Sequence, residues 1–218
     1  MRVVPILFNT DMVQAILDGR KNVTRRVCKD GDEYTIPDMT FYDADKRTYA
    51  IHSFGDKEHR DKLSIAERTC PICPGDTLYV RETWAFISCI CCNGNYNQDG
   101  GPFNCYDYQA VEYDDGDSIS DGCFLYRADC RKPERITWRP SIHMPKQAAR
   151  IWLKVTDVRV ERLQDISLED CVREGIEASR TGIFARFSIL WDSTIKKQFI
   201  AKYGWDANPW VWVIEFER

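Results

Sequence analysis

The sequence predicts a mixed α/β fold, in which short strands alternate with amphipathic helices. Residues 3–8 are apolar and β-prone, and apolar residues at helical spacing follow them. Residues 151–160 alternate between apolar and polar or aromatic side chains, as in a strand with two different faces. Residues 210–216 are apolar almost throughout, which is typical of a strand buried on both faces. These observations place strands near both ends of the chain, with helices between them.

Capping and turn residues define the elements in the first half of the chain. Asn9 is a favourable helix N-cap and Gly19 stands where a glycine commonly ends a helix, so we expect a helix between them. A strand is expected at residues 23–27. Residues 74–76 read PGD, which favours a turn, and a strand at residues 77–84 should follow it.

Similar signals predict two helices in the second half. Ser167 with Asp170 three residues later resembles a capping box, so a helix should begin there and end at Gly175. Residues 184–203 repeat apolar side chains at helical spacing, which predicts a longer helix that Gly204 ends.

Two stretches without clear periodicity are interpreted as insertions into one domain that spans residues 1–218. The first, at about residues 28–70, is rich in charges and predicts one hairpin. The second, at about residues 86–145, is rich in Gly, Asn, Asp and Cys as far as residue 121 and is expected to be loop-like. A further strand is expected at residues 124–128.

The bulk composition excludes several classes of protein. The 218 residues are 44% hydrophobic and 29% charged, which suits a globular chain with one sizeable core. The net charge of -4 and the pI of about 5.5 argue against duplex DNA as a partner, because duplex-binding proteins are generally basic. No stretch approaches the roughly 20 apolar residues that span a bilayer, so no membrane partner is expected.

Ten cysteines make up the next notable feature. Because residues 1–9 are too short for a signal peptide, we expect a cytoplasmic protein, whose cysteines are thiols or metal ligands and not disulfides. Cys70 and Cys73 have zinc-knuckle spacing, and Cys89 or Cys91 with Cys92 would complete four thiolates. A structural zinc on Cys70, Cys73, Cys89 and Cys92 would order an insertion with little core of its own. Alternatively, the first pair only flanks a turn.

Five short segments, in this order along the chain, resemble the ASCH family of the PUA-like group. They read ILDGRK with TRR shortly after it, PGDTLYV, VTDV, a predicted helix that ends in a glutamate, and WVIEF. The resemblance implies a PUA-like β-barrel with flanking helices, which the two insertions enlarge. It extends to phage and prophage members of the family at residues 5–10, 80–84, 138–145 and 205–210.

The family resemblance implies a catalytic role for Lys21, Thr24 and Glu174. The smallest bacterial members are amidohydrolases that remove the acetyl group from N4-acetylcytidine, and their catalytic lysine, threonine and glutamate align with these positions. A threonine hydroxyl becomes a nucleophile when a base takes its proton, and a lysine with a lowered pKa is such a base. No cofactor is required. Alternatively, Lys21 compensates the negative end of the preceding helix and Glu174 is a surface residue.

Basic and aromatic residues suggest how a substrate would be bound. Aromatic faces stack on bases and arginines bind phosphate. If the family's pocket is retained, the residues expected to bind substrate are Arg25, Arg26, Arg81, Trp84 and His143, with Trp138 and Arg139 along the same cleft. The alternative is that the tryptophans pack in a core and the arginines are solvated.

The sequence therefore supports one leading function and two alternatives. The leading function is hydrolysis of an amide on a modified pyrimidine nucleoside or nucleotide, in the cytoplasm of a bacterium or a phage-infected host. The first alternative is a non-catalytic module that binds single-stranded RNA or a nucleotide in the same cleft. The second is a phage accessory protein that binds a host protein.

Overall fold

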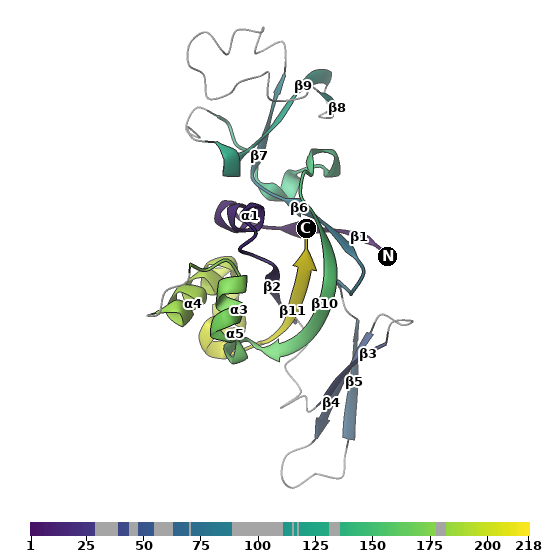
Figure 1. The fold of residues 1–218 in the computed structure, drawn as a ribbon, viewed down its shortest axis with the longest axis vertical. Helices are drawn as coiled ribbons and strands as arrows, with labels where there is room; N and C mark the ends of the chain where they lie inside the picture. Colours follow the sequence, from purple (N-terminus) through teal and green to yellow (C-terminus); the bar gives the residue numbers. More distant parts are fainter. Residues whose placement is uncertain are drawn as a thin grey trace. The chain divides into compact units, whose positions relative to one another are not determined.

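A computed structural model of the chain describes residues 1–28, 39–43, 48–54, 63–69, 71–88, 111–114, 116, 118–130, 136–177 and 182–218. Helices and strands are mixed along it, which confirms the predicted fold class at that level (Figure 1). None of the helices in these residues is both long and apolar enough to cross a membrane. The chain divides into two compact units, one of Met1–Val4, Asp18–Leu78 and Leu153–Arg218, the other of Pro5–Leu17 and Tyr79–Trp152.

The elements have the following bounds. The strands are β1 (Val3–Leu7), β2 (Val23–Val27), β3 (Met39–Asp43), β4 (Thr48–Phe54), β5 (Leu63–Thr69), β6 (Thr77–Arg81), β7 (Trp84–Ser88), β8 (Val111–Asp114), β9 (Ile119–Tyr126), β10 (Trp152–Arg162) and β11 (Trp210–Glu217). The α-helices are α1 (Thr10–Leu17), α3 (Leu168–Arg173), α4 (Ile183–Thr194) and α5 (Ile200–Tyr203).

The sheet that carries the candidate site has the strand order β1-β6-β10-β11-β2. Its β11 pairs antiparallel with β10 and with β2 and is buried along most of its length, as the sequence predicts for residues 210–216. Val213 lies opposite Arg25, and Trp212 lies opposite Arg26. Because successive side chains of a strand point to opposite faces, Arg25 and Arg26 belong to different faces of the sheet.

Helices α3 and α4 cover the face to which Arg25 belongs. Val211 and Val213 of β11 form one apolar core with Cys171 of α3 and with Phe187 and Trp191 of α4. Figure 1 shows these helices beside β2 and β11. The shared core fixes α3 against the strands, and the end of α3 is where the candidate site begins.

Helix α3 begins and ends where the sequence predicts. Ser167 Oγ accepts a hydrogen bond from the backbone N–H of Asp170 at 3.0 Å, as an N-cap residue does. Gly175 has a φ of 95°, a left-handed conformation that glycine adopts without steric cost. Glu174, the C-cap residue, is held by a backbone hydrogen bond of 2.8 Å to the carbonyl of Asp170. Capping thus places Glu174 at a defined turn.

The predicted long helix at residues 184–203 is wrong, since the chain forms α4 and α5 with a break between them. Ile195 after α4 is extended, and the chain turns back. The turn allows the indole N–H of Trp191 to donate a hydrogen bond to the carbonyl of Tyr203 at 2.8 Å. Helical spacing alone does not reveal this contact, because it depends on how the two helices fold onto each other.

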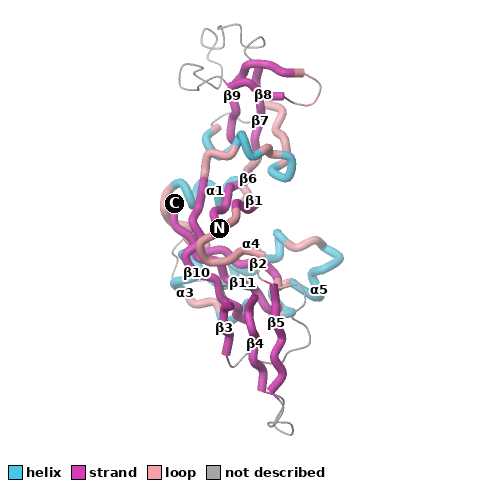
Figure 2. The backbone as a smooth tube through the Cα atoms, turned by 90° about the vertical axis from the view of Figure 1, so that its right-hand side faces the viewer, coloured by secondary structure: helices cyan, strands magenta, loops and turns pink. Residues whose placement is uncertain are grey.

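The predicted insertions contain more strands than expected. In the first, β3, β4 and β5 form an antiparallel sheet in place of one hairpin (Figure 2). In the second unit, β7, β9 and β8 form another sheet where loops are predicted. The predicted strand at 77–84 divides into β6 and β7, and the one at 124–128 is the end of the longer β9.

An aromatic cluster explains the second of these sheets. The ring centroids of Trp84, Tyr113 and Phe124 lie 5.3–6.0 Å apart, although these residues are distant in sequence. Gly122 makes room for the cluster, because a Cβ there would lie 2.4 Å from the ring of Phe86. The strands are therefore stabilised by long-range packing, which a short sequence window does not show.

Candidate functional site

A buried ion pair joins the start of β2 to the end of α3. Lys21 Nζ donates hydrogen bonds to Glu174 Oε2 at 2.6 Å, to the Glu174 carbonyl at 2.9 Å and to the Val23 carbonyl at 2.8 Å. Lys21 is 2% exposed and Glu174 3% exposed. Glu174 is therefore not a surface residue, and Lys21 does more than compensate a helix end.

Burial makes Lys21 easier to deprotonate. Removal of the ammonium from water lowers the pKa of Lys21 below its ordinary 10.5. The charge of Glu174 and its hydrogen bond act in the opposite direction, whereas the charges of Arg26 and Arg25 lower the pKa further. The net effect is a lowered pKa, so Lys21 loses its proton at a lower pH than a solvated lysine does.

Thr24 follows Lys21 three residues later in the chain, on β2. Its side chain is 1% exposed, and its Oγ1 accepts a hydrogen bond from Arg26 Nη1 at 2.9 Å. The same nitrogen donates to the carbonyl of Arg25 at 3.0 Å, so the guanidinium of Arg26 is fixed to the main chain. Burial lowers the pKa of Arg26, and the nearby carboxylate of Glu174 opposes the change. The hydroxyl thus lies directly beside a cation.

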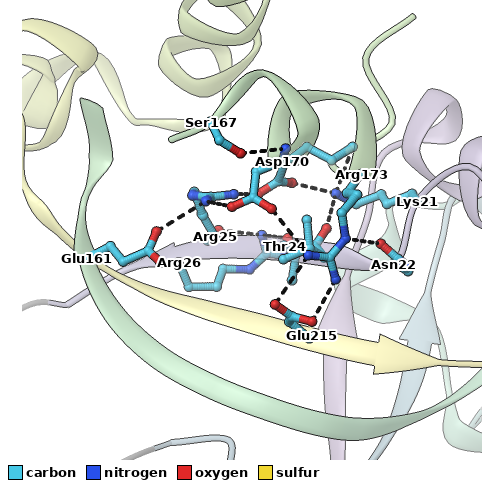
Figure 3. Close-up of polar contacts among 12 residues, drawn as sticks. Lys21, Asn22, Thr24, Arg25, Arg26, Glu161, Ser167, Asp170, Arg173 and Glu215 are labelled. Carbon is cyan, nitrogen blue, oxygen red and sulfur yellow. Dashed lines mark hydrogen bonds and ion pairs between the residues drawn. The ribbon is translucent and has the colours of Figure 1, made fainter. Parts of the chain in front are cut away.

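Arg25 connects Glu174 to two further carboxylates on the helix-covered face. Its Nη1 donates to Glu174 Oε1 at 3.2 Å. Its Nη2 donates to Asp170 Oδ2 at 2.8 Å and to Glu161 Oε2 at 3.3 Å, as Figure 3 shows. Arg25 is 2% exposed. The structure therefore places this residue, expected to bind substrate, in an internal ion-pair network where it holds the carboxylate of Glu174.

The outer part of the network consists of charges that the sequence did not single out. Arg173 Nη2 donates to Glu215 Oε2 at 2.6 Å and Arg159 Nη2 donates to Asp170 Oδ2 at 3.2 Å. Arg159 also contacts Glu161 and Glu215. The sequence does contain a signal for these charges. Arg159 and Glu161 stand two residues apart on β10, opposite the core residues Val213 and Val211 of β11.

The network should make the fold sensitive to acid. Burial works to raise the pKa of Asp170, but Arg25, Arg159 and Arg173 outweigh it and hold the pKa below the ordinary 3.8. The hydrogen bond from Arg173 lowers the pKa of Glu215 below 4.5. As the pH falls below these ordinary values, the unfolded chain takes up protons before the folded one does, so the free energy of unfolding should decrease.

Urea unfolding at pH 7 and at lower pH values tests this prediction. Glu215→Gln should be less stable than the wild type at pH 7 and should lose less stability on acidification. Glu217→Gln is the matched control, because Glu217 is exposed and pairs with the equally exposed Lys154. Equal pH dependence in the wild type and Glu215→Gln would contradict the prediction.

The remaining residues expected to bind substrate belong to the second unit. Arg81 Nε donates to the carbonyl of Met144 at 2.8 Å, and another of its nitrogens bonds the carbonyl of Ile142, so Arg81 holds the segment that contains His143. His143 is exposed. Trp84 is completely buried in the aromatic cluster. These contacts give Arg81 and Trp84 structural roles within that unit.

Two tryptophans of this unit lie beside arginines. The guanidinium of Arg139 lies 5.2 Å from the ring centroid of Trp84, and that of Arg127 lies 5.7 Å from the ring of Trp138. The indole N–H of Trp84 has no hydrogen-bond partner among the described residues. Trp138 and Arg139 therefore each take part in a cation–π contact within this unit.

The expected zinc site falls mostly outside the described part of the chain. Cys70, Cys89 and Cys92 are not among the described residues, whereas Cys73 is described and is fully buried. Within the residues that the structure describes, no cluster of three His, Cys, Asp or Glu side chains is arranged to hold a metal. The zinc site on these cysteines stays a prediction.

The structure places a buried ion pair, formed by Lys21 with Glu174 at the end of α3, on the same segment as a hydroxyl and a second cation. Lys21 and Glu174 share hydrogen bonds, and Thr24 follows three residues later beside Arg26. Such a set can move a proton and carry a nucleophile. Comparison of the chain with family models, curated proteins and solved structures finds no match.

Proposed function

We propose that the protein is an amidohydrolase of the ASCH type that removes the acyl group from an N4-acylated cytidine. The observation that carries the proposal is the buried pair of Lys21 and Glu174 at 2.6 Å, at the start of the strand that bears Thr24. The five segments that resemble the family support the proposal, because they lie on helices, turns and strands in the order that the resemblance implies. The proposal includes a PUA-like barrel built around this sheet.

The reaction would proceed in two stages. Lys21 as the neutral amine accepts the proton of Thr24, whose oxygen attacks the acyl carbonyl and forms a tetrahedral intermediate. The C–N bond then breaks, and Lys21 returns the proton to the departing cytidine amine. Water attacks the resulting threonine ester, its proton passes to Lys21 and then to Thr24, and the carboxylic acid leaves. Water is the only co-reactant.

Glu174 gives Lys21 a way to lose its proton. The three oxygens around Lys21 Nζ suit an ammonium, so a proton must leave before Lys21 acts as a base. The 2.6 Å contact offers Glu174 Oε2 as the acceptor of that proton. Arg25 holds the other oxygen of Glu174 at 3.2 Å and keeps the carboxylate aimed at Lys21.

The alternative of a non-catalytic binding module is supported by a different observation. Thr24 is 1% exposed, so a substrate reaches its hydroxyl only if the neighbouring side chains move. In such a module the same charges would only stabilise the fold, and a nucleoside or single-stranded RNA would bind without being changed.

Incubation of the wild-type protein with N4-acetylcytidine distinguishes the two. The proposal expects cytidine and acetate in equal amounts, with cytidine followed by chromatography, and turnover well beyond one equivalent of protein. Longer N4-acyl cytidines extend the test to the acyl group. Saturable binding of these compounds, or of single-stranded RNA, without any product would contradict the amidohydrolase and favour the binding module.

A further inference from the structure

Hydrolysis through Thr24 requires a group that stabilises negative charge on the acyl oxygen. When Thr24 Oγ1 bonds to the acyl carbon, the carbonyl oxygen becomes an oxyanion that is bonded to the same carbon atom as Oγ1. Donors aimed at that oxygen are commonly a large part of catalysis in acyl transfer. The donor must therefore lie next to Thr24 Oγ1, and it must be held in place before the reaction.

We propose that Arg26 is this donor, an inference that rests on the proposed function of the Lys21 site. Its Nη1 lies 2.9 Å from Thr24 Oγ1. In the resting protein the N–H is donated to the hydroxyl. Once that oxygen is bonded to the acyl carbon it becomes a weaker acceptor, and the adjacent oxyanion takes over the hydrogen bond from Arg26.

Strand β2 fixes the position of the Arg26 guanidinium. Arg26 lies opposite Trp212 in the pairing of β2 with β11, and its Nη1 also donates to the carbonyl of Arg25 at 3.0 Å. A donor fixed in this way needs little rearrangement as charge develops. Arginine also stays protonated in proteins, so it remains a donor while Lys21 changes its charge.

The neighbouring cations are engaged elsewhere. Lys21 Nζ donates to Glu174 and Val23, and the guanidinium of Arg25 is paired with carboxylates on the helix-covered face. Arg26 belongs to the same face of β2 as Thr24 and is partly exposed, whereas Thr24 is buried. An incoming acyl group would thus meet Arg26 before it reaches the hydroxyl.

Steady-state kinetics of Arg26→Gln test the inference on N4-acetylcytidine. We expect kcat to fall by about 10²–10³-fold, with a much smaller change in KM, because the contact strengthens only in the transition state. Arg26→Lys should keep the charge and lose less. Arg20→Gln is the matched control, because Arg20 is exposed and pairs with Asp18, and its activity should equal that of the wild type.

A sulfur substrate separates a catalytic from a merely structural role. Sulfur is a poor hydrogen-bond acceptor, so N4-thioacetylcytidine should slow the wild type relative to the oxygen substrate by more than it slows Arg26→Gln. The same oxygen-to-sulfur ratio in both proteins, or a full kcat in Arg26→Gln, overturns the role of Arg26 and leaves the amidohydrolase intact. Absence of turnover by the wild type contradicts the proposed function and the inference together.

Discussion

Replacement of Thr24 by valine is expected to lower the rate of cytidine release from N4-acetylcytidine by more than about 10⁴-fold, which is typical of the loss of a nucleophile. Valine keeps the β-branched shape that suits β2 and removes the hydroxyl that forms the bond to the acyl carbon. Because Thr24 is buried and accepts a hydrogen bond from Arg26, the change should also cost about 1–3 kcal/mol of stability.

Thr24→Ser is the matched control for this prediction. Serine keeps a hydroxyl beside Arg26 and should retain measurable turnover, although with a less restricted side chain. Thermal unfolding of both variants shows whether the fold is intact at the assay temperature. A folded Thr24→Val variant with wild-type kcat would assign the nucleophile to another group and contradict the mechanism.

Replacement of Lys21 by methionine should abolish turnover to a similar extent, since the general base is removed. Lys21→Arg should not restore activity, because a guanidinium does not give up its proton in proteins. In the wild type, kcat/KM should rise with pH as Lys21 becomes neutral, and the rise should be complete below 10.5 because burial lowers its pKa. Activity that falls across this range would contradict Lys21 as the base.

Stability measurements separate the two roles of the ion pair. Lys21→Met leaves the buried carboxylate of Glu174 without its closest partner, which should cost about 3–5 kcal/mol. Adding Glu174→Gln removes that charge and should restore part of the loss. The double variant should nevertheless remain inactive. If it regained turnover together with stability, Lys21 would be a structural residue only.

Elements with strong local signals could be predicted from the sequence. The cap at Ser167, the left-handed turn at Gly175 and the apolar run of β11 depend on residues close together in the chain, and the structure has each of them. The break after α4 could not be predicted in this way, nor could β7 and β8. These features depend on contacts between residues far apart in sequence, such as those between Trp84, Tyr113 and Phe124.

For the candidate site as well, some features follow from the sequence and others only from the tertiary structure. The sequence by itself singled out Lys21, Thr24 and Glu174, through short segments that resemble the ASCH family. Only the tertiary structure decided that Lys21 and Glu174 meet in a buried pair and that Arg25 faces the helices while Arg26 accompanies Thr24. Motifs identify side chains, but the alternation of a paired strand and the burial of its charges decide which of them meet.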